Sequence, residues 1–392
     1  MKVLMINVVC GIRSTGRICT DLAKALEEQG HEVKIAYGRE SVPKQMQKYA
    51  VKIGTDFDIK MHGLKARLLD EAGFGSEKAT RKFIKWIKKY DPDIIHIHNI
   101  HGYYINVKIL FDYFKESNKR VIWTLHDCWP FTGHCTYFDY INCNKWKNGC
   151  EHCPQKLEYP KQYGLDMSRR NYALKKKIFT GVKKMYLVTP SKWLAELTSE
   201  SFLKEYPTYV IHNGIDTQIF KPCDSNLKEK YNCQNKIIIL GVASTWTKRK
   251  GLDTFIELSK MLESNYQIIL VGLSNKQILK IPKNIISIER TNSVKELAEL
   301  YSTADVFINP TLEDNYPTTN LEAIACGTPV ITYDTGGSCE SAKGYGISVA
   351  KGDVNGILEA LNKVEQIERK RMDIDYRSTV KKYIELYKKI DN

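Results

Sequence analysis

The sequence predicts an α/β protein of two domains, each built on β-α-β units, and three observations support this prediction. Apolar and amphipathic stretches alternate from the N-terminus, with a strand over residues 3–9, a helix over about 18–29 and a strand over 33–37. The same alternation restarts at residue 237, after a polar stretch. The length of 392 residues suits two domains of ordinary size.

The first domain is expected over residues 1–212. A loop at 10–17 follows its first strand, and a basic amphipathic helix is predicted over 78–90. Two apolar runs that contain histidines predict buried strands at 93–99 and 120–127. Further strands are expected at 185–190 and 209–212, with a helix that begins at Ser191.

The second domain is expected over residues 237–372, joined to the first by a linker over 213–236. A last helix over 373–392 is expected to return to the first domain, because Val380, Tyr383, Ile384 and Tyr387 form one apolar stripe. Strands are predicted in the second domain at 237–243, 268–272, 285–288, 306–309 and 328–333, and helices at 252–262, 294–302 and 319–326.

The main candidate site lies in the stretch 304–337, which has the order strand, loop, helix, strand. Thr319 is expected to cap the helix, with Glu322 completing a capping box. A helix that starts at the carboxyl end of a strand directs free N–H groups to the crevice where such sheets bind ligands, and these groups suit a phosphate. Glu322 would then meet ribose or sugar hydroxyls. Alternatively it only closes the capping box, which leaves the acidic pair Glu313-Asp314 and the later pair Gly336-Gly337 unexplained.

This stretch resembles the nucleotide-sugar site of the retaining family-4 glycosyltransferases. That family has two Glu with seven residues between them, the second followed by Ala and then by a Gly-Thr-Pro-Val turn. Glu322, Ala323 and residues 327–330 match, whereas Asp314 replaces the first Glu and Glu313 lies one residue out of register. The resemblance covers most of the chain. It implies the GT-B fold, with two Rossmann-like doubly wound domains that face each other across a cleft.

A cationic loop precedes the helix at 252–262. Lys248, Arg249 and Lys250 lie just before its N-terminus, where they suit a diphosphate, and a solvated run of charge is the alternative. The resemblance assigns Lys250 and Gly251 to a Lys-Gly pair of the family. Arg249 is expected to substitute for an Arg that the family has earlier in this loop.

For the reaction, the resemblance implies transfer of a sugar from a UDP- or GDP-sugar with retention at the anomeric carbon. Arg249, Lys250 and the helix N–H groups would stabilise the diphosphate leaving group without a divalent metal. Glu322 would hold the ribose and Asp314 the sugar hydroxyls, while His126 matches a histidine that the family places near the donor sugar. Further donor contacts are expected from Gly16, Arg17, Glu313, Asn315, Thr318, Thr319 and Asn320.

A cysteine-rich insertion is expected over residues 128–160. Cys135, Cys143, Cys150 and Cys153 lie within 19 residues of each other, the last two as Cys-x-x-Cys. This spacing favours a structural zinc site in a reducing compartment, and free thiols or a disulfide are the alternatives. A metal would give this polar loop an order that a small apolar core cannot.

Three further histidines follow one another closely. His96 and His98 point to one face of the expected strand, and His101 follows in the loop. They have the types of metal ligands, but no carboxylate or cysteine nearby in the sequence completes a set. A structural or acceptor-lining role is therefore favoured over a metal site.

Charge is distributed unevenly along the chain. Residues 1–200 hold 34 Lys and Arg against 21 Asp and Glu, or +13, and residues 201–392 hold 25 against 24, or +1. The asymmetry favours an anionic partner for the first half, and nucleic acid, an anionic membrane leaflet and a phosphorylated acceptor all qualify. A merely solvated basic surface is the alternative. We expect an anionic membrane, contacted by basic helices near 78–90 and 169–184 with Trp86 or Phe179 in the interface.

The sequence thus predicts a glycosyltransferase of bacterial surface polysaccharide biosynthesis with a glycan or lipid-linked acceptor. It has no apolar run of about 18 residues and no N-terminal stretch of signal-peptide type, so we expect a cytoplasmic protein, peripheral on the inner face of the cell membrane. A GT-B nucleotide-sugar epimerase and a basic, zinc-stabilised nucleic-acid-binding protein are the alternatives. Only one Lys or Arg lies between residues 303 and 350, which argues against nucleic acid as a partner.

Overall fold

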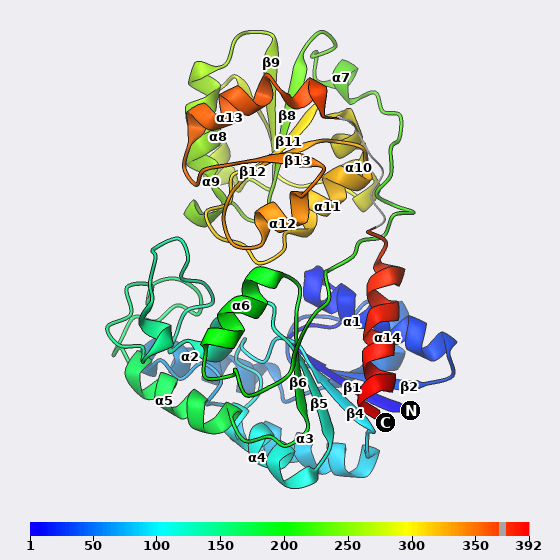
Figure 1. Cartoon of the computed structure of the whole chain (residues 1–392), viewed down its shortest axis with the longest axis vertical. Coiled ribbons are helices and arrows are strands. Elements are labelled where there is room, and N and C mark those ends of the chain that lie inside the picture. The colour runs from blue at the N-terminus through cyan, green and yellow to red at the C-terminus, as the bar shows by residue number, and fades with distance from the viewer. Residues whose placement is uncertain (368–373, 392) are drawn as a thin grey trace. The chain divides into compact units, whose positions relative to one another are not determined.

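The computed structural model describes residues 1–367 and 374–391, and the chain divides into two compact units. Unit 1 comprises Met1–His212 together with Val380–Asn392, and unit 2 comprises Asn213–Thr379. Figure 1 shows each unit as a sheet with helices packed around it. The expected boundary at 372/373 lies outside the described residues, as does Asn392.

Unit 1 contains a seven-stranded parallel sheet in the order β3-β2-β1-β4-β5-β6-β7. Its strands are β1 (Lys2–Asn7), β2 (Glu32–Tyr37), β3 (Ala50–Lys52), β4 (Ile94–Ile97), β5 (Arg120–Thr124), β6 (Met185–Thr189) and β7 (Thr208–Val210). Its α-helices are α1 (Arg13–Glu28), α2 (Asp56–Leu69), α3 (Glu77–Tyr90), α4 (Val107–Ser117), α5 (Ser168–Phe179), α6 (Lys192–Glu200) and most of α14 (Tyr376–Asp391). Short 3₁₀ helices are η1 (Lys44–Tyr49), η2 (Trp129–Phe131) and η3 (Lys145–Lys147).

Unit 2 contains a six-stranded parallel sheet in the order β10-β9-β8-β11-β12-β13. Its strands are β8 (Ile237–Val242), β9 (Tyr266–Val271), β10 (Ile285–Ile288), β11 (Val306–Asn309), β12 (Val330–Tyr333) and β13 (Gly346–Val349). Its helices are α7 (Leu227–Lys230), α8 (Leu252–Met261), α9 (Asn275–Ile278), α10 (Val294–Thr303), α11 (Thr318–Ala325), α12 (Ser338–Ala342), α13 (Val354–Leu361), η4 (Lys248–Lys250) and η5 (Val364–Gln366). Strand order reverses between β8 and β11, and open α/β sheets bind ligands beyond the carboxyl ends of the strands at such a point.

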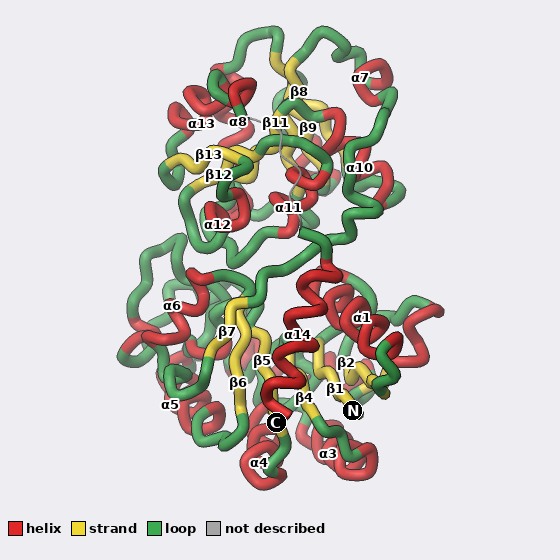
Figure 2. Tube along the Cα trace, turned by 45° about the vertical axis from the view of Figure 1, so that its right-hand side comes forward, coloured by secondary structure: helices red, strands yellow, loops and turns green. Residues whose placement is uncertain are grey.

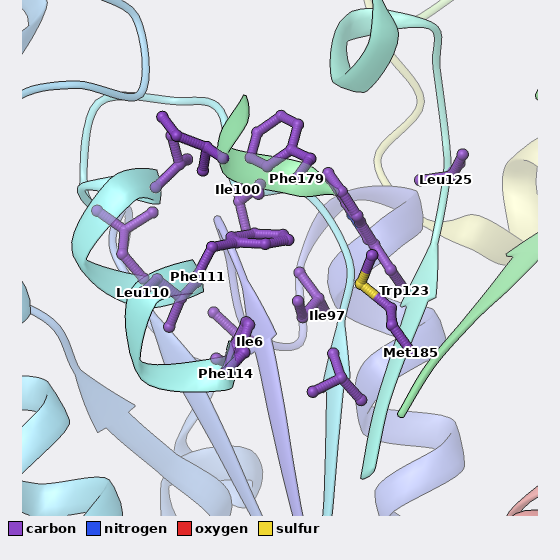
Figure 3. Packing of buried hydrophobic residues seen from close by; sticks show 14 of the residues in the cluster. Ile6, Ile97, Ile100, Leu110, Phe111, Phe114, Trp123, Leu125, Phe179 and Met185 are labelled. Carbon is purple, nitrogen blue, oxygen red and sulfur yellow. The ribbon is translucent and has the colours of Figure 1, made fainter. Parts of the chain in front are cut away.

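The core of unit 1 is aromatic where the sheet meets α4 and α5. Phe111 of α4 lies 5.3 Å from Trp123 of β5 and 4.6 Å from Phe179 at the end of α5, as ring centroids (Figure 3). Phe179 is fully buried, so the expectation that it dips into a membrane interface is wrong. Trp86 is half-buried and stacks between Phe83 and Tyr90 on α3.

Helix α14 completes the core of unit 1 (Figure 2). The Tyr387 hydroxyl lies 2.6 Å from Nδ1 of His96, and the Tyr383 hydroxyl lies 3.1 Å from the Thr124 hydroxyl. Both tyrosines are buried in the unit. The apolar stripe that the sequence shows in this helix therefore packs on the sheet that contains the first strand.

Two stretches of the chain differ from the expected local structure. Helix α1 begins at Arg13 rather than near Ile18, so Gly16 is a helical residue and not a loop residue. A Cβ at Gly16 would lie 3.0 Å from the Val9 side chain, so the absence of a side chain at this position allows α1 to pack closely against Val9. Residues 213–236, expected as a linker, lie within unit 2, where Phe220 and Leu227 are buried.

Candidate active site

Two loops meet at the carboxyl edge of the unit 2 sheet, where the strand order reverses. The loop after β8 ends in η4, and the loop after β11 contains Glu313 and Asp314. Nζ of Lys250 lies 2.5 Å from Oδ2 of Asp314, and a guanidinium N–H of Arg249 donates to the Glu313 carbonyl at 2.7 Å. The Leu312 N–H donates to the Arg249 carbonyl at 2.8 Å. The structure therefore brings four of the sequence-predicted residues together.

Two glycines allow these loops to approach so closely. A Cβ at Gly251, which has a φ of +75°, would lie 2.1 Å from the Pro310 carbonyl oxygen. A Cβ at Gly336, with a φ of +55°, would lie 2.0 Å from the Asp314 carbonyl oxygen, to which the Gly337 N–H donates at 3.1 Å. The Lys-Gly pair and the Gly-Gly pair of the sequence thus fix the backbone on either side of the acidic loop.

The charges at this edge favour an ionised carboxylate beside two cations. Burial of the Asp314 carboxyl raises its pKa, but Lys250 and Arg249 outweigh that effect and hold the pKa below its usual value. The Asp314 side chain is 14% exposed and that of Lys250 25%, so solvent screens the pair only partly. Cations held beside a parallel sheet edge are well placed to bind a diphosphate.

Helix α11 begins one residue earlier than expected, and the predicted capping box is wrong. Pro317 is the N-cap residue and Thr318 the first helical residue, because the ring of Pro317 already fixes the backbone angle that leads into the helix. Glu322 therefore lies beyond the third helical position and cannot close a capping box. Instead its Oε2 accepts a hydrogen bond from the Tyr301 hydroxyl of α10 at 3.1 Å, and its side chain is buried.

The other residues expected to contact a donor divide into two groups. Thr318 and Thr319 are half-buried in the first turn of α11. Asn315 is buried before the helix, and Asn320 is buried within it. The Asn320 amide accepts from Asn309 at 2.7 Å and donates to the Ser341 hydroxyl at 2.8 Å. Asn320 therefore ties α11 to β11 and α12, and its side chain is used in positioning the helix.

In unit 1, imidazoles gather at the carboxyl ends of β4 and β5. Nδ1 of His98 lies 3.0 Å from Nε2 of His126, and Nε2 of His101 lies 2.8 Å from Oδ2 of Asp127. Burial lowers the pKa of His126 to about 4, with Asp127 opposing that shift. His126 is therefore neutral at neutral pH and can donate or accept a hydrogen bond there without carrying charge.

The histidine run does not form a metal centre. His96 is fully buried and is engaged by Tyr387 on one ring nitrogen and by Thr124, at 2.8 Å, on the other. Among residues 1–367 and 374–391, no three His, Cys, Asp or Glu side chains are placed so that they could hold a metal ion. The structural role that the sequence favours for His96 agrees with these contacts. Gly16 is buried and Arg17 exposed on α1, also in unit 1.

The cysteine-rich insertion is irregular, as expected, and has a small core of its own. Phe131, Phe138 and Trp146 pack with ring centroids 5.0 to 6.3 Å apart. One small cavity in this insertion is bordered by His134 and by all four cysteines named above. None of these four cysteines forms a disulfide. The insertion therefore does not depend on a metal alone for its order.

Three contacts in and near these sites escaped the sequence analysis. Lys175, read as part of a surface basic run, is buried: its ammonium donates to the carbonyls of Trp129 and Thr132 at 2.8 and 3.0 Å, and burial lowers its pKa to about 7. His134 lies 2.6 Å from Asp70, and both are buried. The third contact is the hydrogen bond that the Tyr301 hydroxyl donates to Glu322. The local signal for the burial of Lys175 is the set of apolar residues that lie three or four positions from it on the same face of α5.

Comparison with known proteins identifies related sequences over nearly the whole chain. The family model described as Glycosyltransferase Family 4 matches residues 15–219, and the model described as Glycosyl transferases group 1 matches residues 224–381. The putative colanic acid biosynthesis glycosyl transferase WcaC of Escherichia coli K12 is 24% identical over 343 residues, 84% of this chain and 82% of WcaC. The capsular polysaccharide biosynthesis glycosyltransferase CapM of Staphylococcus aureus is 26% identical over 42% of this chain and 46% of CapM.

A solved structure shares the fold. Anabaena HepE, in complex with UDP, superposes with a TM-score of 0.68 at 14% identity and covers 99% of this chain and 100% of HepE. Such a likeness at low identity establishes the architecture of two parallel-sheet α/β domains. Within the described residues, none of the helices has the combination of length and hydrophobicity that crossing a bilayer requires.

Proposed function

Because this chain belongs to glycosyltransferase family 4 and has the GT-B fold, we propose that it transfers a sugar, with retention, from a nucleoside diphosphate sugar. The donor base is uridine or guanosine, and the acceptor is a glycan or a lipid-linked glycan. One observation carries the proposal: Arg249 and Lys250 lie beside the acidic loop of Asp314 at the point where the sheet reverses its strand order.

The diphosphate leaving group determines what this site must do. Negative charge develops on it as the glycosidic bond breaks, and preorganised cations and N–H groups lower that barrier. Lys250, Arg249 and the free N–H groups of Thr318 and Thr319 in the first turn of α11 would supply this stabilisation. A divalent metal is then not required for the step.

The remaining side chains would orient the donor. Glu322 would hold the ribose hydroxyls, with the Tyr301 hydroxyl fixing its carboxylate. Asp314 would hold hydroxyls of the sugar and, through its pair with Lys250, keep the ammonium directed to the phosphates. His126 of unit 1 would offer a neutral imidazole to the sugar. Catalysis of this kind depends on position, since each group acts only within hydrogen-bond reach.

The relatives and the charge distribution support a biological setting for this reaction. CapM is named for capsular polysaccharide biosynthesis, and WcaC for colanic acid biosynthesis. A lipid-linked glycan acceptor would place the protein at the cytoplasmic face of the cell membrane, where the basic first half of the chain meets anionic lipid.

We also propose a structural zinc ion in the insertion of unit 1. Cys135, Cys143, Cys150 and Cys153 border one cavity, although their side chains are not drawn together as a ligand set. Thiolates are the ligands that structural zinc sites use, and zinc would fix the insertion without taking part in transfer. This site is separate from the residues that would bind the donor.

A panel of UDP- and GDP-sugars tests the proposal. Donor hydrolysis and thermal shift should single out one nucleotide sugar, and a product with the anomeric configuration of that donor would establish retention. Inversion at the anomeric carbon would contradict the mechanism, and a donor epimerised without transfer would replace it with an epimerase.

A further inference from the structure

Helix α2 carries an apolar stripe on its outer face. Phe57, Met61, Leu64 and Leu68 follow one another at helical spacing and are 41 to 70% exposed. The opposite face, with His62, is the one that unit 1 buries. The fold therefore uses one side of α2 and leaves an apolar side exposed.

The segment that follows the cysteine-rich insertion extends this stripe. The Tyr163 N–H donates to the Arg67 carbonyl at 2.8 Å, and a Cβ at Gly164 would lie 2.1 Å from the Leu68 carbonyl oxygen. This segment thus lies against the C-terminal half of α2, with Tyr163 and Leu165 64% and 67% exposed. We call the resulting area the α2 surface: Phe57, Met61, Leu64, Leu68, Tyr163 and Leu165.

Cations flank the stripe on both sides. Lys60 and Arg67 lie on one flank by helical spacing and Lys65 on the other, and all three are exposed. None of these three forms an ion pair with another described residue. An apolar face between unpaired cations matches the interface of an anionic bilayer, which offers acyl chains below and phosphates above. A second copy of this chain would instead oppose cations with the same cations.

Helix α3 is the more basic helix but lacks these properties. Its Arg81, Lys85 and Lys88 line a groove together with carboxylates, among them Glu77 and Asp112. Its apolar residues Phe83 and Ile87 are buried. Basic charge alone is therefore a weaker guide to the membrane-facing side than exposed apolar area next to unpaired cations.

We propose that the α2 surface docks this protein on an anionic membrane, with the apolar stripe in the interface and the three flanking cations at the lipid phosphates. The proposal deepens the proposed function, on which it rests for a lipid-linked acceptor.

Co-sedimentation with vesicles tests the proposal, using phosphatidylcholine alone and phosphatidylcholine with 30 mol% phosphatidylglycerol, at low salt. We expect the wild type to bind only the anionic vesicles. Leu64→Ser with Leu68→Ser should weaken binding about tenfold or more, because the two side chains leave the interface. Lys60→Glu, Lys65→Glu and Arg67→Glu together should weaken it on the order of 100-fold.

The matched control changes α3: Lys82→Glu, Lys85→Glu and Lys88→Glu together should leave binding within about threefold if α2 makes the contact. Loss of binding in this control with unchanged binding in both α2 variants would overturn the proposal. The proposal would also be overturned if the wild type did not bind anionic vesicles. A wild-type dimer in sedimentation velocity that becomes a monomer in the Leu64→Ser with Leu68→Ser variant would overturn it as well. Donor hydrolysis is measured on the same proteins. Normal hydrolysis together with unchanged vesicle binding by the α2 variants would overturn only the role of the α2 surface. Vesicle binding without activity on any donor would overturn only the proposed function.

Discussion

The two units of this protein differ completely in their histidine content. All nine histidines lie between residues 31 and 212, in unit 1, and unit 2 has none. The carboxyl edge of the unit 1 sheet accordingly presents neutral imidazoles such as His98 and His126, whereas that of unit 2 presents the fixed charges of Lys250, Arg249 and Asp314. Two sheets of the same type thus offer different chemistry at the same edge. Proton-dependent behaviour should come from unit 1, and binding of the donor diphosphate from unit 2.

The largest effect should come from removing fixed charge in unit 2. Lys250→Ala should lower the transfer rate by about 10²-fold or more, since stabilisation of the leaving group is worth a few kcal/mol. Lys260→Ala, at an exposed lysine in the last turn of α8, is the matched control and should stay near the wild type. Steady-state kinetics on the chosen donor measure both. Equal activity of the two variants would show that unit 2 does not bind the diphosphate through Lys250.

Glu322 offers a finer test of the same edge. Glu322→Ala should also cost about 10²-fold, and Glu322→Gln should cost about tenfold, because Gln still accepts from Tyr301 but has lost its charge. Tyr301→Phe keeps the carboxylate and removes only the hydroxyl, so it should mainly raise KM. Near-normal activity of Glu322→Gln would argue against a ribose-binding carboxylate.

Acid should destabilise unit 1 before unit 2. Burial lowers the pKa to about 4 in His62, about 3 in His96 and about 4 in His126, and well below its usual value in His98. The unfolded chain protonates these rings near pH 6.5 and the folded chain only far below, so stability present above pH 6.5 is lost as the pH falls towards 4. Each histidine contributes up to about 1.4 kcal/mol per pH unit.

Tryptophan fluorescence can follow this difference. Trp246 is the single tryptophan of unit 2, and the other five lie in unit 1. In Trp246→Phe protein, urea unfolding monitored between pH 7 and 4.5 should shift to lower urea, while donor binding to unit 2 should change little. A urea midpoint that is flat over this range would contradict the assignment of buried neutral histidines.

The smallest effect should follow removal of metal from the insertion. About one zinc ion per chain is expected in protein purified without a histidine tag, and chelation should lower the melting temperature of unit 1 by a few degrees, because an aromatic core also holds the insertion. Donor affinity should not change. Zinc far below one per chain, by elemental analysis, would leave the four cysteines as free thiols.

The sequence predicted the parts of the molecule that depend on local pattern. The strands at 285–288 and 306–309 follow from apolar runs. The family resemblance assigned Lys250 and Asp314 to one donor site, but it did not predict that the two side chains pair with each other. The sequence missed contacts between residues far apart, such as that of Tyr301 with Glu322, because nothing local marks them. It also misjudged Lys175 and Phe179, whose burial depends on how α5 packs on the sheet. The sequence could not predict that the α2 stripe is exposed, because α2 has apolar residues on both of its faces.

Helix α14 affects the order in which the two units of the chain can complete their folding. His96, in the strand beside the first strand, has its hydrogen-bond partner Tyr387 almost 300 residues later. While the polypeptide is being synthesised, the early sheet lacks this cover until α14 has emerged, although domains usually fold as units from the N-terminus onwards. Unit 2 is a single uninterrupted segment and has no such dependence. The half of the protein that is translated second can therefore reach its native state first, and the early half is the one exposed to chaperones and proteases in the meantime.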